Sequence, residues 1–131
     1  MQKSALILMT EYIDFFDFDP GCIAIFEALR DVLLEKYPDM QVFRQKTCLS
    51  FRDPRPFCYV SRAKAWNRKK NAERYVVLSF ALSMPVPDER IHYCVQVTPN
   101  RFTHHVAVGS VDEIDDQLLA WLHMARRLKD K

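Results

Sequence analysis

The 131-residue chain has only two glycines, Gly21 and Gly109, and they lie far apart. It therefore contains no glycine-rich phosphate loop, and neither a G-x-S-x-G nor an H-E-x-x-H motif is present. Its longest uninterrupted apolar runs, such as Ala5–Met9, are far shorter than the ~20 residues of a membrane-spanning helix. These absences exclude the enzyme classes built on those motifs. We expect a single domain over residues 1–131 that needs no cofactor.

The cysteines form no recognisable pairing pattern. None of the four lies in a C-x-x-C motif, and no histidine stands at zinc-finger distance from a close cysteine pair. The short apolar patch near the N-terminus is followed directly by Glu11 and Asp14, which is unlike an export signal. We therefore expect buried free thiols and a cytoplasmic protein. The cysteines are Cys22, Cys48, Cys58 and Cys94.

Helical periodicity occurs at both ends of the chain. Apolar residues at three- and four-residue steps predict a helix over residues 20–37, with Asp19 as its cap and Pro20 in its first position. A second apolar stripe predicts a helix that begins at Ser110, with acids in its first turns and bases in its last. A shorter helical turn is expected after Thr10.

Between the two helices the pattern has a period of two. Segments rich in Val, Phe, Tyr and Thr are separated by turn residues, among them Asp53-Pro54-Arg55-Pro56. Short links between consecutive strands favour an antiparallel sheet. We predict an α+β fold in which about five strands are covered on one face by the two helices, as a two-layer sandwich. The predicted strands are 41–52, 57–62, 75–83, 92–98 and 103–109.

Strand alternation brings polar side chains to the face opposite the helices. If Leu49, Phe51 and Val106 point to the helices, the neighbouring polar residues point the other way. A small anionic ligand or a partner segment could be held there by Lys46, Ser50, Arg101 and His105 together. Ordinary solvated strand positions are the alternative. Ser50 or Cys48 could also act as a nucleophile, but no orienting carboxylate is near, so we expect a binding domain rather than an enzyme.

Residues 62–74 carry six basic side chains and one acid around a tryptophan. Basic side chains can hold a nucleic-acid backbone while an aromatic ring stacks on a base. A solvated connection between two strands is the alternative, and no helix-turn-helix or aromatic-strand RNA signature is present. The candidate nucleic-acid contacts are Arg62, Lys64, Trp66, Arg68, Lys69, Lys70 and Arg74.

Acidic residues gather before the first predicted helix. Clustered carboxylates can bind hard cations, although the spacing here fits no calcium loop. Acids near a helix start also interact favourably with the helix dipole, which is the alternative. The candidate metal ligands are Glu11, Asp14, Asp17 and Asp19.

Several segments resemble a bacterial family catalogued as a domain of unknown function, DUF5655. They are Gln45–Arg52, Phe57, Arg101–Val106, Asp112–Asp115 and Leu119–Leu122. The family looks like K-T-x-I-S-F, later R-W-T-H-H-V, then a D-E-L-D helix with W-L, and the resemblance runs from about Phe16 to Ala125. Cys48-Leu49 and Phe102 depart from that pattern. The matching positions imply these candidate ligand-binding residues: Lys46, Ser50, Arg101, Thr103, His104 and His105.

Two further interpretations concern partners. The order of helix, antiparallel sheet and helix is similar to YdhG-like and frataxin-like α/β sandwiches, some of which are discussed as iron chaperones. This likeness implies an iron chaperone that uses the acids near residues 11–19, with Asp112–Asp116 as further candidates. The nine Phe, five Tyr and two Trp residues are also enough to line a homodimer contact.

Overall fold

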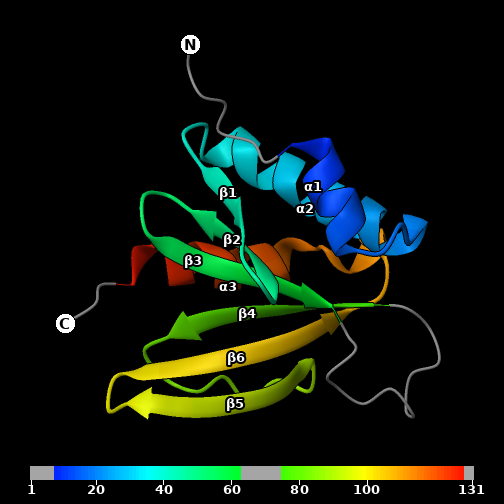
Figure 1. Ribbon diagram of the computed structural model, residues 1–131. Helices are drawn as coiled ribbons and strands as arrows, with labels where there is room; N and C mark the ends of the chain where they lie inside the picture. Colours follow the sequence, from blue (N-terminus) through cyan, green and yellow to red (C-terminus); the bar gives the residue numbers. More distant parts are fainter. Residues whose placement is uncertain (1–7, 63–74, 129–131) are drawn as a thin grey trace.

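A computed structural model describes residues 8–62 and 75–128 of the chain (Figure 1). Within these residues the helices lie toward the two ends of the sequence, and the strands lie between them. No helix in the described ranges is long and apolar enough to cross a membrane. The elements are α1 Met9–Phe15, α2 Pro20–Lys36, β1 Gln41–Arg44, β2 Cys48–Arg52, β3 Pro56–Arg62, β4 Val76–Leu82, β5 Ile91–Thr98, β6 Arg101–Val108, the 3₁₀ turn η2 Val111–Glu113 and α3 Asp116–Arg127.

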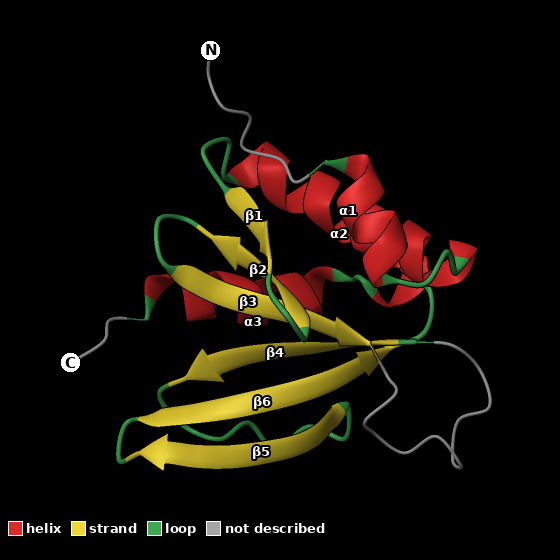
Figure 2. Ribbon diagram, viewed as in Figure 1, coloured by secondary structure: helices red, strands yellow, loops and turns green. Residues whose placement is uncertain are grey.

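The strands form one antiparallel sheet in the order β1-β2-β3-β4-β6-β5 (Figure 2). After β4 the chain passes to the far edge as β5 and returns through a hairpin as β6, between β4 and β5. The predicted α+β fold with an antiparallel sheet is therefore confirmed. The described part has six strands instead of about five, because the predicted strand 41–52 is two strands joined by a turn that a hydrogen bond from Gln45 N–H to the Cys48 carbonyl closes.

The helix ends follow local capping chemistry. The Asp19 carboxylate accepts hydrogen bonds from the backbone N–H groups of Gly21 (2.9 Å) and Cys22 (3.1 Å), as predicted for the start of α2. The last helix differs from the prediction. Ser110 precedes only the η2 turn, and α3 starts later, where Asp115 accepts from Leu118 N–H. The predicted cap Thr10 lies inside α1, which begins at Met9.

The core lies between the helices and one face of the sheet. Phe26 of α2 is fully buried, and its ring stacks on Phe51 of β2 at 5.8 Å. On α3, Trp121 stacks on Phe80 of β4 at 6.1 Å. We call the sheet face opposite these helices the open face.

Candidate functional site

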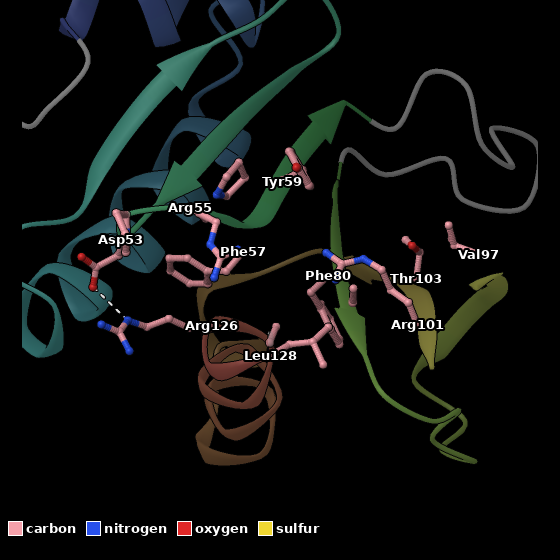
Figure 3. Close-up of a pocket in the computed structure, with 14 residues that line it drawn as sticks. Asp53, Arg55, Phe57, Tyr59, Phe80, Val97, Arg101, Thr103, Arg126 and Leu128 are labelled. Atoms are coloured by element: carbon pink, nitrogen blue, oxygen red, sulfur yellow. Dashed lines mark hydrogen bonds and ion pairs between the residues drawn. The ribbon is translucent and has the colours of Figure 1, made fainter. Parts of the chain in front are cut away.

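A cleft opens where two neighbouring strands of the sheet separate. β3 and β4 pair only between Tyr59–Arg62 and Val76–Ser79, and toward the start of β3 and the end of β4 they diverge. The end of α3 closes the space between them, and the resulting hollow has a volume of about 290 Å³ (Figure 3). We call it the β3/β4 cleft. Its lining residues are Asp53, Pro54, Arg55, Pro56, Phe57, Tyr59, Phe80, Ala81, Val97, Arg101, Thr103, Ala125, Arg126 and Leu128.

The polar lining of the β3/β4 cleft is predominantly cationic, with three arginines against one aspartate. Arg55 comes from the turn before β3 and Arg101 from the start of β6, so they reach the cleft from opposite sides (Figure 3). The hydroxyls of Tyr59 and Thr103 lie on the same lining. This combination of guanidinium groups and hydroxyls is suited to an anion, because both present hydrogen-bond donors.

The Tyr59 hydroxyl remains protonated at neutral pH. Burial raises its pKa, the nearby Cys48 thiol adds to that rise, and the positive charges of Arg52 and Arg101 oppose it without reversing it. A protonated phenol can donate a hydrogen bond. Tyr59 is therefore equipped to act as a neutral donor beside the arginines.

One wall of the cleft is held by an ion pair. The Arg126 Nε of α3 donates to the Asp53 carboxylate at 2.9 Å, and the Arg126 guanidinium lies over the Tyr37 ring with its Cζ 4.4 Å from the ring centroid. The Asp53 side chain is only 12% exposed. Asp53 offsets the charge of Arg126, and Arg55 and Arg101 bring two further guanidinium groups to the cleft lining.

The Asp53→Asn variant is expected to lower the free energy of unfolding by about 1–2 kcal/mol, because it removes a charge-assisted hydrogen bond that water only partly screens. Urea unfolding followed by circular dichroism measures the change. Asp31→Asn is the matched control: Asp31 pairs with Arg30 at 3.0 Å, but its side chain is 66% exposed. That change should cost no more than about 0.5 kcal/mol. Equal losses in the two variants would show that the wall does not depend on the Asp53–Arg126 pair.

Of the residues predicted for the open face, Ser50 and His105 do lie on one face but do not meet. Cross-strand pairing aligns Ser50, Tyr59, Ser79 and His105 in one row over β2, β3, β4 and β6. Two strands stand between Ser50 and His105, which corresponds to ~14 Å at the usual strand spacing. Lys46 lies in the β1–β2 turn and not on a strand. The predicted four-residue site is thus not assembled, and of its members only Arg101 lines the β3/β4 cleft.

Two members of that row have local partners. The Ser50 side chain is fully buried, and Arg52 Nε donates to its hydroxyl at 3.3 Å while the Arg52 guanidinium lies over the Phe43 ring. His105 Nδ1 hydrogen-bonds the Ser79 hydroxyl at 2.8 Å, and its ring stacks on Tyr93. Burial lowers the His105 pKa, and His104 and His92 lower it further, so the imidazole is neutral at neutral pH. Ser50 therefore offers no accessible group to a ligand.

His104 belongs to the core and not to the open face. It is fully buried, and Phe80 stacks on its ring at 5.6 Å. Its two ring nitrogens hydrogen-bond the Phe102 carbonyl (3.0 Å) and the Val86 N–H (3.1 Å). The ligand-binding role that the family resemblance implied for His104 conflicts with this placement, since both of its nitrogens are used within the fold.

The thiols of Cys48 and Cys58 lack the activation of a nucleophile. Burial raises the pKa of Cys48, and it raises that of Cys58 much further. A reactive cysteine needs a lowered pKa. The alternative that Cys48 or Ser50 serves as a catalytic nucleophile thus receives no support from its surroundings.

The four candidate metal ligands are engaged separately. Asp19 caps α2, Asp14 pairs with Arg44 at 3.0 Å and Asp17 approaches Arg62 at 3.7 Å. Glu11 accepts a hydrogen bond from the Leu8 N–H. Over residues 8–62 and 75–128 there is no group of three or more potential ligands that could hold a metal ion. These acids serve capping and ion pairs instead of converging, and their role as metal ligands stays a prediction.

The predicted nucleic-acid contacts fall almost entirely outside the described residues. Only Arg62, at the end of β3, is described. The other members of that prediction, Lys64, Trp66, Arg68, Lys69, Lys70 and Arg74, lie in the segment 63–74 and stay a prediction.

Comparison with known families gives a match over most of the chain. The model of the family described as "Domain of unknown function (DUF5655)" matches residues 19–129. Searches of curated proteins and of solved structures found no match. The similarity to YdhG-like and frataxin-like sandwiches stays a prediction. The match covers α2, all the described strands and the β3/β4 cleft. The chain therefore belongs to the DUF5655 family, a domain of unknown function.

Proposed function

We propose that this protein is a binding domain that holds a small anionic ligand in the β3/β4 cleft, with Arg101 and Arg55 as the charged contacts. The observation that carries the proposal is the convergence of these two arginines, from separate elements, on one hollow of the sheet. A planar guanidinium can donate two parallel hydrogen bonds to a carboxylate or phosphate. Tyr59 and Thr103 supply further hydroxyl contacts from the same lining.

The dimensions of the cleft favour a small ligand. A volume of about 290 Å³ is at the lower end of the range for small-molecule sites. Phe57, Phe80 and Leu128 add apolar surface beside the arginines. Such a lining is matched by a carboxylate or phosphate on a compact organic group rather than by a long polymer.

The lining favours binding over turnover. The carboxylate that lines the cleft, Asp53, is already engaged by Arg126. General acid–base catalysis needs a titratable group within hydrogen-bonding reach of the reacting atoms. The described lining offers cations and hydroxyls but no general base that is available for catalysis. These groups are therefore suited to binding a ligand.

Titration with inorganic phosphate and with benzoate, followed by backbone amide chemical shifts, tests the proposal. We expect saturable shifts at Arg55, Tyr59, Arg101 and Thr103 for at least one probe. Arg101→Gln should weaken that binding at least roughly tenfold, because it removes a charge-assisted contact. Arg44→Gln is the matched control, since Arg44 pairs with Asp14 at 3.0 Å and does not line the cleft. Absence of shifts for both probes, or equal weakening in the two variants, would refute the proposal.

A further inference from the structure

A second hollow lies between the C-terminal end of α2 and the first turns of α3. Its volume is about 550 Å³, which is within the range of small-molecule sites. We call it the α2/α3 groove. Among the described residues, none lines both this groove and the β3/β4 cleft, so the two are separate. The groove is lined by Val32, Leu33, Glu35, Lys36, Tyr37, Asp116, Leu119, Ala120 and His123.

Apolar side chains form much of the α2/α3 groove. Leu33 and Tyr37 are buried and Leu119 is half-buried, whereas Val32 is 38% exposed. A ligand with an apolar body would remove the exposed part of this surface from water, which is favourable. The groove therefore suits a molecule that is apolar over most of its length.

A hydrogen-bonded tyrosine and histidine contribute a polar group to this lining. The Tyr37 hydroxyl hydrogen-bonds His123 Nδ1, and the two rings are parallel to within 4°. Burial raises the pKa of Tyr37, so its hydroxyl is protonated at neutral pH and is the donor. Burial and nearby cations lower the pKa of His123, so its ring is neutral. Because Nδ1 accepts, the ring proton is on Nε2, and His123 adds an N–H donor to the groove.

Positive charge gathers at the His123 end of the groove. The charged side chains that act on the pKa of His123 are all cations, and each of them lowers it. They are Lys36 of α2 and Arg126 and Arg127 of α3. Arg126 is engaged by Asp53, whereas Lys36 lines the groove itself. An anion beside the imidazole is attracted by this charge and can accept a hydrogen bond from the ring.

We propose that the α2/α3 groove binds a small monocarboxylate with an apolar body. The carboxylate accepts the hydrogen bond of the His123 Nε2–H and pairs with the Lys36 ammonium. The apolar body covers Leu33 and Leu119. This site is additional to the one proposed in the β3/β4 cleft and does not depend on it.

The acids on the lining favour a ligand with one carboxylate over a ligand with two. Glu35 and Asp116 both line the groove. Asp116 precedes His123 by seven residues on α3, which corresponds to about 10 Å along a helix. A second carboxylate at the far end of the ligand would therefore approach a like charge.

Titration of the full chain with hexanoate, followed by NMR, tests the proposal. We expect saturable backbone amide shifts at Leu33, Leu119, Ala120 and His123. The pKa of His123, read from the shifts of its ring protons, should rise when hexanoate is bound, because a nearby carboxylate stabilises the charged imidazole. Acetate, which lacks the apolar body, and 1-hexanol, which lacks the charge, should each bind at least roughly tenfold more weakly.

Two variants separate the parts of the site. Lys36→Gln should weaken hexanoate binding roughly threefold, because it removes an exposed cation that water partly screens. Ala120→Phe should weaken it at least roughly tenfold, because the larger side chain occupies the groove. Arg44→Gln is the control, since Arg44 is an exposed cation on β1 that does not line the groove. Circular dichroism verifies that each variant is folded.

Each outcome bears on the proposal. Saturable hexanoate binding that weakens in both groove variants and not in Arg44→Gln supports it, as does a raised His123 pKa. Absence of shifts with hexanoate overturns it, and so does equally tight binding of 1-hexanol. Shifts confined to the lining of the β3/β4 cleft would assign hexanoate to that cleft. That result would overturn the present proposal while leaving the proposed function in place.

Discussion

Replacing Phe26 with alanine is expected to lower the free energy of unfolding by about 3–5 kcal/mol, the cost of removing a buried aromatic ring and leaving a cavity. Phe26 is fully buried and joins three elements. Its ring lies 4.7 Å from Tyr12 of α1, 5.7 Å from Phe16 and 5.8 Å from Phe51 of β2. No single neighbour can move to fill the space without losing its own contacts, so the cavity should persist.

Equilibrium unfolding in urea measures this loss, and Phe18→Ala is its matched control. Phe18 lies a few residues before α2 and is 69% exposed. Its φ of 60° is retained when one non-glycine residue replaces another, so the control adds no backbone effect. That variant should change the free energy of unfolding by less than about 0.5 kcal/mol. A loss below about 1 kcal/mol for Phe26→Ala would mean that the α1–α2–β2 contact is not a rigid core.

Local signals in the sequence were sufficient for much of the fold. The cap of α2 was predictable because the Asp19 carboxylate reaches N–H groups only two and three residues away. The shared face of Ser50 and His105 was predictable as well, since strand side chains alternate with a period of two. Both inferences use interactions that span a few residues, which is the range over which sequence pattern is informative.

The distance between those two residues was not predictable in the same way. Alternation tells which face a side chain occupies but not how many strands separate it from another. β6 inserts between β4 and β5, and β3 and β4 stand between Ser50 and His105. Strand order is set by long-range packing and by the path of the 83–90 connection. Residues that alternation alone assigned to one site therefore lie several strands apart.

The turn that lines the β3/β4 cleft was predictable from the sequence, but its role was not. Residues 53–56 were predicted as a turn because of their prolines, and they do connect β2 to β3. What the turn does follows from tertiary contacts: Asp53 is tied to Arg126 of α3, and Arg55 is left on the cleft lining. The sequence does show an aspartate and an arginine within one proline-containing turn. Their different roles depend on α3, whose residues lie some seventy positions later in the chain, so the turn sequence alone does not reveal them.

Acidification is expected to destabilise the protein through His104. The buried ring donates from Nδ1 to the Phe102 carbonyl and accepts at Nε2 from the Val86 N–H, which fixes the neutral form. Burial lowers its pKa, and the bond to Phe102 only partly opposes this. The stabilising contribution is therefore present above the unfolded-state pKa of about 6.5 and is lost as the pH falls toward the lowered folded-state pKa, by up to about 1.4 kcal/mol per pH unit.

Urea unfolding at a series of pH values between about 7.5 and 5 measures this slope, with His104→Gln as the decisive variant. A glutamine amide can donate to the Phe102 carbonyl and accept from Val86 but takes up no proton in this range. The variant should be less stable near neutral pH, because it loses the ring stacked on Phe80 at 5.6 Å. It should also show a shallower loss on acidification. His105, whose pKa burial also lowers, is retained in the variant, so any remaining slope belongs to the other histidines and carboxylates. If the free energy of unfolding falls equally steeply with pH in His104→Gln, the hydrogen-bonded imidazole does not cause the loss of stability in acid.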